Sequence, residues 1–266
     1  MESRATRIGL WIWVALVLLF LYIPIAVICL YAFDDATVQS WPIGKLTTRW
    51  FGPAIHNGDM QQALWLSLEA AALATFIALV LGTLASFGVH RFRFFGREAI
   101  SFLLVLPIAL PGIITGMALN SYFVFWKVNF GLLTIVIGHA TFCIVVVYNN
   151  VIARLRRVSN SMYEAAADLG ASGFFSFRTI TVPMLSTALL SGALLAFALS
   201  FDEVIVTTFT AGAQNTLPLW IFGAIRLGQQ LPEVNVVVVF VLLLTVIPVA
   251  VAARLAGSGG VARSLT

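Results

Sequence analysis

Charged side chains are scarce in this sequence. Lys and Arg together number 15 and Asp and Glu 11 in a chain of 266 residues, so charged residues make up 10% of the chain and hydrophobic residues 61%. A typical soluble domain contains about 25% charged residues. So few charges cannot cover a water-facing surface of this size. The composition therefore excludes a soluble enzyme and a soluble nucleic-acid-binding domain.

Cysteine and lysine are rarer still. Cys29 and Cys143 lie inside apolar runs with neither metal-ligand spacing nor a disulfide framework, so we expect both to be buried as small hydrophobic side chains. The two lysines, Lys45 and Lys127, do not belong to a GxxxxGK[ST] phosphate-binding loop. The sequence thus predicts no metal site and no bound cofactor. Any ATP hydrolysis that drives the protein would belong to another chain.

Long apolar runs dominate the rest of the chain. A helix rises about 1.5 Å per residue, so about 20 apolar residues cross the hydrocarbon core of a bilayer. The first such run is charge-free and too long for a signal-peptide core, so we expect it to remain as an anchor. Six runs predict an all-α membrane protein with one transmembrane domain over residues 1–266: Ile8–Phe33, Ala63–Val89, Ala99–Trp126, Gly131–Asn150, Met184–Thr208 and Val234–Ala253.

The distribution of Lys and Arg predicts the orientation of these runs. If the N-terminus is cytoplasmic, eleven of the fifteen basic residues fall on the cytoplasmic side, including Arg254 and Arg263 near the C-terminus. Cytoplasmic loops of membrane proteins are enriched in Lys and Arg. We therefore expect both termini to face the cytoplasm. Four basic residues remain outside: Lys45, Arg49, Lys127 and Arg226.

The third run is irregular. Pro107 and Pro111 each remove a backbone donor, and Gly112 and Gly116 have the GxxxG spacing that permits close helix approach. A break inside a bilayer is tolerated where neighbouring helices or a cavity satisfy the freed carbonyls. Two interpretations remain open for this run. It is either a kink needed for packing or part of a translocation path.

One predicted cytoplasmic loop, Val151–Pro183, is longer than the others. Ser161 and Glu164 have the spacing of a capping box, a run of alanines follows, and Gly170 is a natural helix stop. We expect a helix of about two turns here. A second helical stretch, Phe174–Ile180, is expected to end at Pro183.

This loop resembles the EAA loop of ABC-importer permease subunits. The resemblance rests on Glu164-Ala165-Ala166, three residues, Gly170, nine residues, Ile180, one residue, Val182 and Pro183. The family pattern has Leu at the position of Val182. The alternative is an unrelated amphipathic connector. The resemblance implies a type I ABC importer permease fold with six transmembrane helices and a loop that docks into a separate ATP-binding subunit. It assigns the coupling role to Glu164, Ala165, Ala166, Gly170, Ile180 and Pro183.

Longer stretches are similar to the spermidine/putrescine permease subfamily, although permeases for other solutes share several of them: residues 22–33, 138–155, 194–212, 216–228 and 232–237. The similarity implies half of a polyamine path in a bacterial inner membrane. It also implies a second permease, two copies of an ATP-binding subunit, and a periplasmic or lipid-anchored solute-binding protein. The alternatives are an ABC permease for an anion, a sugar or a metal ion, a proton-coupled carrier, and a membrane enzyme.

Two carboxylates near the outer end of the fifth run are candidates for contact with a cationic solute. Asp202 and Glu203 have no basic residue nearby, and neighbouring side chains on a helix point about 100° apart, so we expect them to face different surroundings. Tyr122, Trp126 and Trp220 are aromatic candidates for cation–π contact. The alternatives are that a carboxylate caps a helix or pairs with a partner subunit, and that the tryptophans anchor the interface.

Two polar residues inside other runs, Glu69 and His139, are expected to satisfy neighbouring helices. Neither has a recognisable proton-relay partner, which argues against a proton-coupled carrier.

Two predicted outer segments lie between the long apolar runs. Residues 217–222 are apolar but too short to cross, and predict a short re-entrant or surface helix. The outer loop Asp34–Gln62 holds Trp41, Trp50 and Phe51, and is either a docking surface for a binding protein or a cap that packs on itself.

Overall fold

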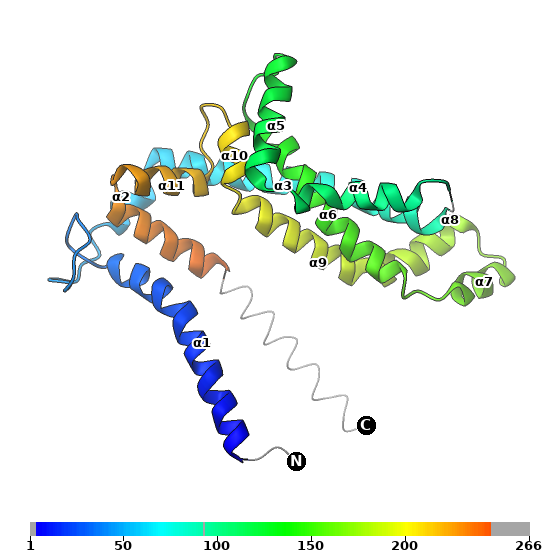
Figure 1. Ribbon diagram of the computed structural model, residues 1–266, viewed down its shortest axis with the longest axis horizontal. Coiled ribbons are helices and arrows are strands. Elements are labelled where there is room, and N and C mark those ends of the chain that lie inside the picture. The colour runs from blue at the N-terminus through cyan, green and yellow to red at the C-terminus, as the bar shows by residue number, and fades with distance from the viewer. Residues whose placement is uncertain (1–3, 93, 246–266) are drawn as a thin grey trace. The chain divides into compact units, whose positions relative to one another are not determined.

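The computed structural model of the chain describes residues 4–92 and 94–245 (Figure 1). In these residues the secondary structure is helical, apart from one isolated antiparallel bridge between Asp34 and Leu46. The chain divides into two units, residues 1–61 with 223–266, and residues 62–222.

The first unit begins with α1 (Arg4–Tyr31), a 28-residue helix whose side chains are almost all exposed along its length. A helix that is apolar on every face suits a lipid environment. The loop that follows folds on itself around α2 (Phe51–His56). The Trp50 indole donates to the Asp34 carbonyl at 3.0 Å, and the Phe51 ring lies 5.1 Å from that of Phe33. Trp41, in contrast, is 77% exposed. Trp50 and Phe51 therefore support the alternative in which this loop packs on itself.

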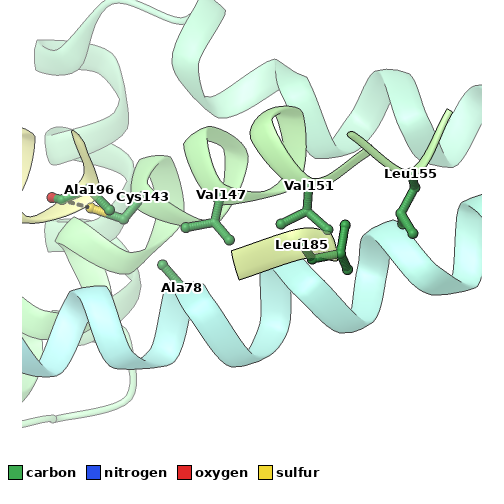
Figure 2. Close-up of a cluster of buried hydrophobic side chains, with 7 residues drawn as sticks. All are labelled: Ala78, Cys143, Val147, Val151, Leu155, Leu185 and Ala196. Atoms are coloured by element: carbon green, nitrogen blue, oxygen red, sulfur yellow. Dashed lines mark hydrogen bonds between the residues drawn. The ribbon is translucent and has the colours of Figure 1, made fainter. Parts of the chain in front are cut away.

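The second unit is built on three long helices, α3 (Gly58–Arg91), α6 (Leu132–Leu155) and α9 (Val182–Phe201). The helices α6 and α9 run antiparallel and side by side (Figure 1). Figure 2 shows the buried cluster that joins the three: Ala78, Cys143, Val147, Val151, Leu155, Leu185 and Ala196. The predicted burial of Cys143 is thus confirmed, and its thiol donates to the Ala196 carbonyl at 3.3 Å. Cys29 is only half-buried.

Small residues allow these helices to approach closely. A Cβ placed on Gly82 of α3 would lie 2.8 Å from the Ile144 carbonyl oxygen of α6. One turn further along, the Ser86 hydroxyl lies 3.1 Å from the Tyr148 carbonyl. Between membrane helices, close backbone contact and hydrogen bonds replace the hydrophobic driving force. Gly82 and Ser86 therefore hold α3 against α6.

Within residues 4–92 and 94–245, four helices are long and apolar enough to cross a membrane, or five if one bent pair is counted as a single span. The predicted first, second and fourth runs match α1, α3 and α6. An apolar helix, Leu231–Thr245, includes the first part of the predicted sixth run, Val234–Ala253. The rest of that run lies outside the described residues, as do Arg254 and Arg263.

The third predicted run is not one continuous helix. It consists of α4 (Arg97–Ala109) and α5 (Gly112–Phe125), which meet at an angle of 102°. Leu110 is extended, with ψ of 142°, as expected for a residue that precedes a proline. Pro107, by contrast, lies inside α4. The sequence thus predicted the irregularity correctly, and Pro111 is where the helix breaks.

The fifth predicted run, Met184–Thr208, is also interrupted. The helix α9 ends at Phe201, and the short helix α10 (Ile205–Thr210) follows after three residues. The prediction of a single helix here was wrong. The apolar residues 217–222 form the start of α11 (Leu217–Leu227), in agreement with the predicted short helix.

Candidate functional site

The predicted coupling loop contains α7 (Asn160–Asp168), a helix of nine residues. Its N-cap is Ser159, whose hydroxyl accepts a hydrogen bond from the Ser161 backbone N–H at 3.3 Å. The predicted capping box between Ser161 and Glu164 was therefore wrong, because Ser161 already lies in the first turn. Glu164 is consequently not used in capping, and its side chain is exposed.

Gly170 ends this helix as predicted. Its φ is +78°, a left-handed conformation that glycine adopts without strain. The Gly170 N–H donates to the Ala167 carbonyl, and the Ala171 N–H donates to the Ala166 carbonyl, both at 2.9 Å. These two bonds form a Schellman motif. The chain therefore turns sharply after α7.

The second helical stretch does not end at Pro183. Helix α8 (Gly173–Ser176), the π-helix η1 (Phe177–Thr181) and α9 form one helical run of 29 residues, Gly173–Phe201. In the π turn, the Val182 N–H donates to the carbonyl of Phe177, five residues back. The proline, which has no N–H, follows directly. The shift from four-residue to five-residue hydrogen bonds occurs directly before Pro183, where the missing N–H would otherwise leave a carbonyl unpaired. The helix therefore continues through the proline.

The loop presents an exposed surface of small and apolar side chains. Glu164 and Ala165 are exposed, whereas Ala166 is half-buried. Leu169 is 88% exposed, and Phe174 and Phe175 are also exposed. Exposed apolar patches mark interaction sites. One contact ties this surface to the spanning helix: the Tyr163 hydroxyl lies 3.1 Å from the Thr181 hydroxyl.

The two candidate carboxylates lie in the interruption between α9 and α10. Glu203 Oε1 accepts a hydrogen bond from the Val206 N–H at 2.9 Å, so it caps the first turn of α10. Asp202 is exposed, and in the described part of the chain its carboxylate has neither a hydrogen bond nor an ion pair. The alternative of a helix cap thus applies to Glu203. Asp202 is the carboxylate that is free to meet a solute.

His139 of α6 contacts both helices that flank this interruption. It is 1% exposed, and its ring nitrogens lie 2.8 Å from the hydroxyl groups of Ser200 in α9 and Thr207 in α10. The single hydroxyl proton of Thr207 is donated to the Glu203 carbonyl at 2.7 Å. Thr207 therefore accepts from His139 Nε2–H, and Nδ1 accepts from Ser200. Both ring nitrogens are used, and the prediction that His139 satisfies neighbouring helices is confirmed.

The predicted GxxxG pair of α5 packs against α10. A Cβ placed on Gly112 would lie 3.6 Å from Ile205, and one on Gly116 would lie 2.6 Å from Phe209. Asn120, one turn further, donates to the Phe209 carbonyl at 2.7 Å. Because both contacts advance by four residues in the same direction, α5 and α10 are parallel, and they begin side by side. The predicted break before α5 and the break between α9 and α10, which the sequence did not predict, are thus neighbours.

The aromatic candidates do not gather at Asp202. Tyr122 and Trp126 are exposed, with ring centroids 6.4 Å apart. Tyr122 lies ten residues, or about 15 Å, along α5 from Gly112, which is level with the start of α10. Trp220 of α11 is buried. The structure therefore separates the carboxylate from Tyr122 and Trp126, which the sequence placed near it.

Glu69 differs from the prediction made for it. It is exposed on α3, and in the described residues it makes no hydrogen bond or ion pair. The residue that joins neighbouring segments at this level is Ser67, whose hydroxyl accepts from the Leu217 N–H at 2.7 Å. A serine in an apolar run gives no signal of such a contact in the sequence. In the described residues, no group of His, Cys, Asp or Glu is arranged to hold a metal ion.

Comparison with known proteins identifies the family. Residues 78–257 match the model of the family described as binding-protein-dependent transport system inner membrane component. The chain belongs to this family. It is thus a permease subunit of an ABC importer, a membrane component rather than an enzyme, and such permeases work with a partner permease, an ATPase and a binding protein.

Two relatives and one solved structure are similar to this permease over most of its length. The putrescine transport system permease protein PotI of Escherichia coli (strain K12) is 37% identical over 231 residues, covering 84% of this chain and 82% of PotI. The spermidine/putrescine transport system permease protein PotC of the same strain is 32% identical over 232 residues, covering 86% and 87%. A bacterial ABC transporter involved in the import of the acidic polysaccharide alginate has a similar fold, with a TM-score of 0.69, 16% identity, and coverage of 96% and 98%.

Proposed function

We propose that this permease imports polyamines such as putrescine and spermidine. The observation that carries the proposal is the similarity to PotI and PotC over more than four fifths of the chain. The carboxylate of Asp202, which has no partner among the described residues, supports it, because a carboxylate at the break between α9 and α10 suits a protonated amine.

In this proposal Asp202 contacts the solute directly. Glu203 acts through structure, because its carboxylate holds the start of α10 and thereby positions Asp202. Tyr122 and Trp126 offer exposed aromatic faces to an amine at another point of the path. Trp220 supports the path as a buried packing residue.

The proposed coupling surface is the exposed side of α7 and the turn after it. Small side chains at Ala165 and Ala166 let the backbone of a partner approach closely, and Glu164 supplies a negative charge beside them. Gly170 sets the turn, and Ile180 and Pro183 lie on the helical run that leads into α9. Movement of a docked ATP-binding subunit would reach the membrane through this run.

The proposed assembly is a heterodimer of this permease with a second one, two copies of the ATP-binding subunit, and a periplasmic or lipid-anchored solute-binding protein. In it, residues 1–266 form one transmembrane domain with both termini in the cytoplasm. The excess of Lys and Arg on the cytoplasmic side supports this orientation.

Uptake by the reconstituted importer tests the proposal. The complex is purified through this chain, placed in liposomes with its binding protein, and supplied with ATP and labelled putrescine, spermidine, sulfate or maltose. We expect uptake of the two polyamines only. Uptake of sulfate or maltose without uptake of either polyamine would contradict the polyamine assignment, and a complex that lacks an ATPase would contradict the coupling surface.

A further inference from the structure

A cavity of about 500 Å³ lies between α6 and α9, at the end of the second unit opposite to Asp202. It is separate from the break between α9 and α10 and from the exposed face of α7. Its polar lining consists of Asn149, Asn150, Arg154, Arg157, Thr187 and Ser191. The lining contains two guanidinium groups, two amides and two hydroxyls, and no carboxylate. This chemistry is complementary to an anion.

The two arginines retain donors for a ligand. Arg154 is partly buried, and its Nε donates to the Met184 carbonyl at 3.0 Å, which fixes the guanidinium at the cavity. Among the described residues, its terminal nitrogens have no hydrogen-bond partner. Arg157 lies one turn further along, on the exposed side. Across the described ranges 4–92 and 94–245, the one ion pair is that of Arg49 with Asp35, so neither cavity arginine has a carboxylate partner there.

The depth of the cavity places it at a membrane surface. Arg154 is 22 residues, or about 33 Å, along α6 from Leu132, and the hydrocarbon core of a bilayer is about 30 Å thick. At the same level α3 ends in Arg91, since Val89 packs with Tyr148 and Ile152. Basic residues therefore end both helices where phospholipid headgroups lie. In the predicted orientation this is the cytoplasmic leaflet.

We propose that this cavity binds the phosphate of an anionic phospholipid. Arginine pairs with phosphate through two parallel hydrogen bonds, and basic pockets between membrane helices at this surface suit lipid headgroups. Thr187 adds a hydroxyl donor from α9, whereas the Ser191 hydroxyl donates within the protein, to the Ala188 carbonyl or to Asn150 Oδ1. A lipid held there bridges α6 and α9 next to the start of the coupling loop. The cavity does not suit the cargo of the proposed function, because two guanidiniums repel a protonated amine.

Lipid retention by the whole importer tests this site. The complex purified through this chain is reconstituted in nanodiscs of equal phosphatidylglycerol and phosphatidylcholine, extracted in mild detergent, and analysed by native mass spectrometry. The variants are Arg154→Gln with Arg157→Gln, Arg157→Gln alone, and the matched control Arg156→Gln, which removes a neighbouring charge outside the cavity lining. Soluble glycerol phosphate is added as a competitor.

We expect the wild type and Arg156→Gln to retain phosphatidylglycerol over phosphatidylcholine. The double variant should lose retention about 10- to 100-fold, because hydrogen bonds to charged groups are among the strong ones. Arg157→Gln alone leaves the Arg154–Met184 bond intact and should lose part of the phosphatidylglycerol retention. This single variant tests the site if the double variant fails to fold. Equal retention by all variants, equal loss in Arg156→Gln, binding of glycerol phosphate without lipid, or a partner subunit's side chain in place of lipid would each overturn the proposal.

Discussion

The phenolic oxygen of Tyr163 in α7 lies 3.1 Å from the hydroxyl oxygen of Thr181, which belongs to the π turn that leads into α9. This is a direct side-chain link between the proposed docking helix and a membrane-spanning helix. Thr181 is itself buried, so the link joins the exposed loop to a fixed point of the second unit.

Removal of this link should weaken coupling more than stability. Tyr163→Phe deletes only the hydroxyl, and the net contribution of such a hydrogen bond is about 0.5–1.5 kcal/mol. We expect a complex that assembles normally but shows less transport per ATP hydrolysed. The measurement compares labelled uptake with phosphate release in the same liposomes. Thr181→Val should give the same defect, and the double variant should add little to either. An unchanged ratio in both single variants would remove the link from the coupling route.

Gly170→Ala should impair docking of the ATP-binding subunit. An alanine at φ of +78° is strained by about 1 kcal/mol, which displaces the turn after α7. We expect a several-fold loss of ATPase in pull-downs through this chain. Gly173→Ala is the matched control, because Gly173 lies in α8 with open space around it and without a positive φ. Equal losses in the two variants would show that the left-handed turn is not the cause.

Asp202→Asn should reduce polyamine uptake at least about tenfold, since loss of a charged contact of this kind is worth more than 1.4 kcal/mol. Glu203→Gln should have a smaller effect, because the glutamine carbonyl still accepts the Val206 N–H. The measurement is the concentration dependence of putrescine uptake, with permease abundance in the membrane as the control. If Asp202→Asn leaves the uptake curve unchanged, the carboxylate does not meet the solute.

His139→Leu should destabilise the permease. It leaves the buried Ser200 hydroxyl without its acceptor, and an unsatisfied group of this kind is unfavourable by about 1–3 kcal/mol. The Thr207 hydroxyl loses the bond from His139 but keeps its bond to the Glu203 carbonyl. We expect a lower melting temperature in detergent. Ser200→Ala removes only one of the two bonds and should have about half the effect. A melting temperature equal to that of the wild type would mean that the break between α9 and α10 is held by other contacts.

Gly82→Ala should separate α3 from α6. The added Cβ would lie 2.8 Å from a backbone oxygen and 3.0 Å from Val147 Cβ, and such overpacking is unfavourable by about 1–3 kcal/mol. Gly88→Ala, on the same helix with open space around the site, should be neutral or slightly stabilising. Thermal unfolding of the two variants in detergent makes the comparison, and similar melting temperatures would contradict the close approach.

The helical runs and the coupling loop follow from local features of the sequence. Apolar length predicted α1, α3 and α6, Pro111 predicted a break, and Gly170 predicted a helix end. The break after Phe201 has no such signal, because no proline or glycine lies there. It depends on contacts with Ser200 and Thr207 made by a histidine more than 60 residues away.

The parallel packing of α5 and α10 has a mechanical consequence. Each helix starts directly after an interruption of its own span, and Gly112 and Gly116 fix the two against each other from their first turns. We therefore expect a displacement of one helix to move the other, so that the two interruptions act as a single hinge. The aromatic end of α5 would therefore swing together with the segment that follows Asp202, and a solute at one place would influence the position of the other.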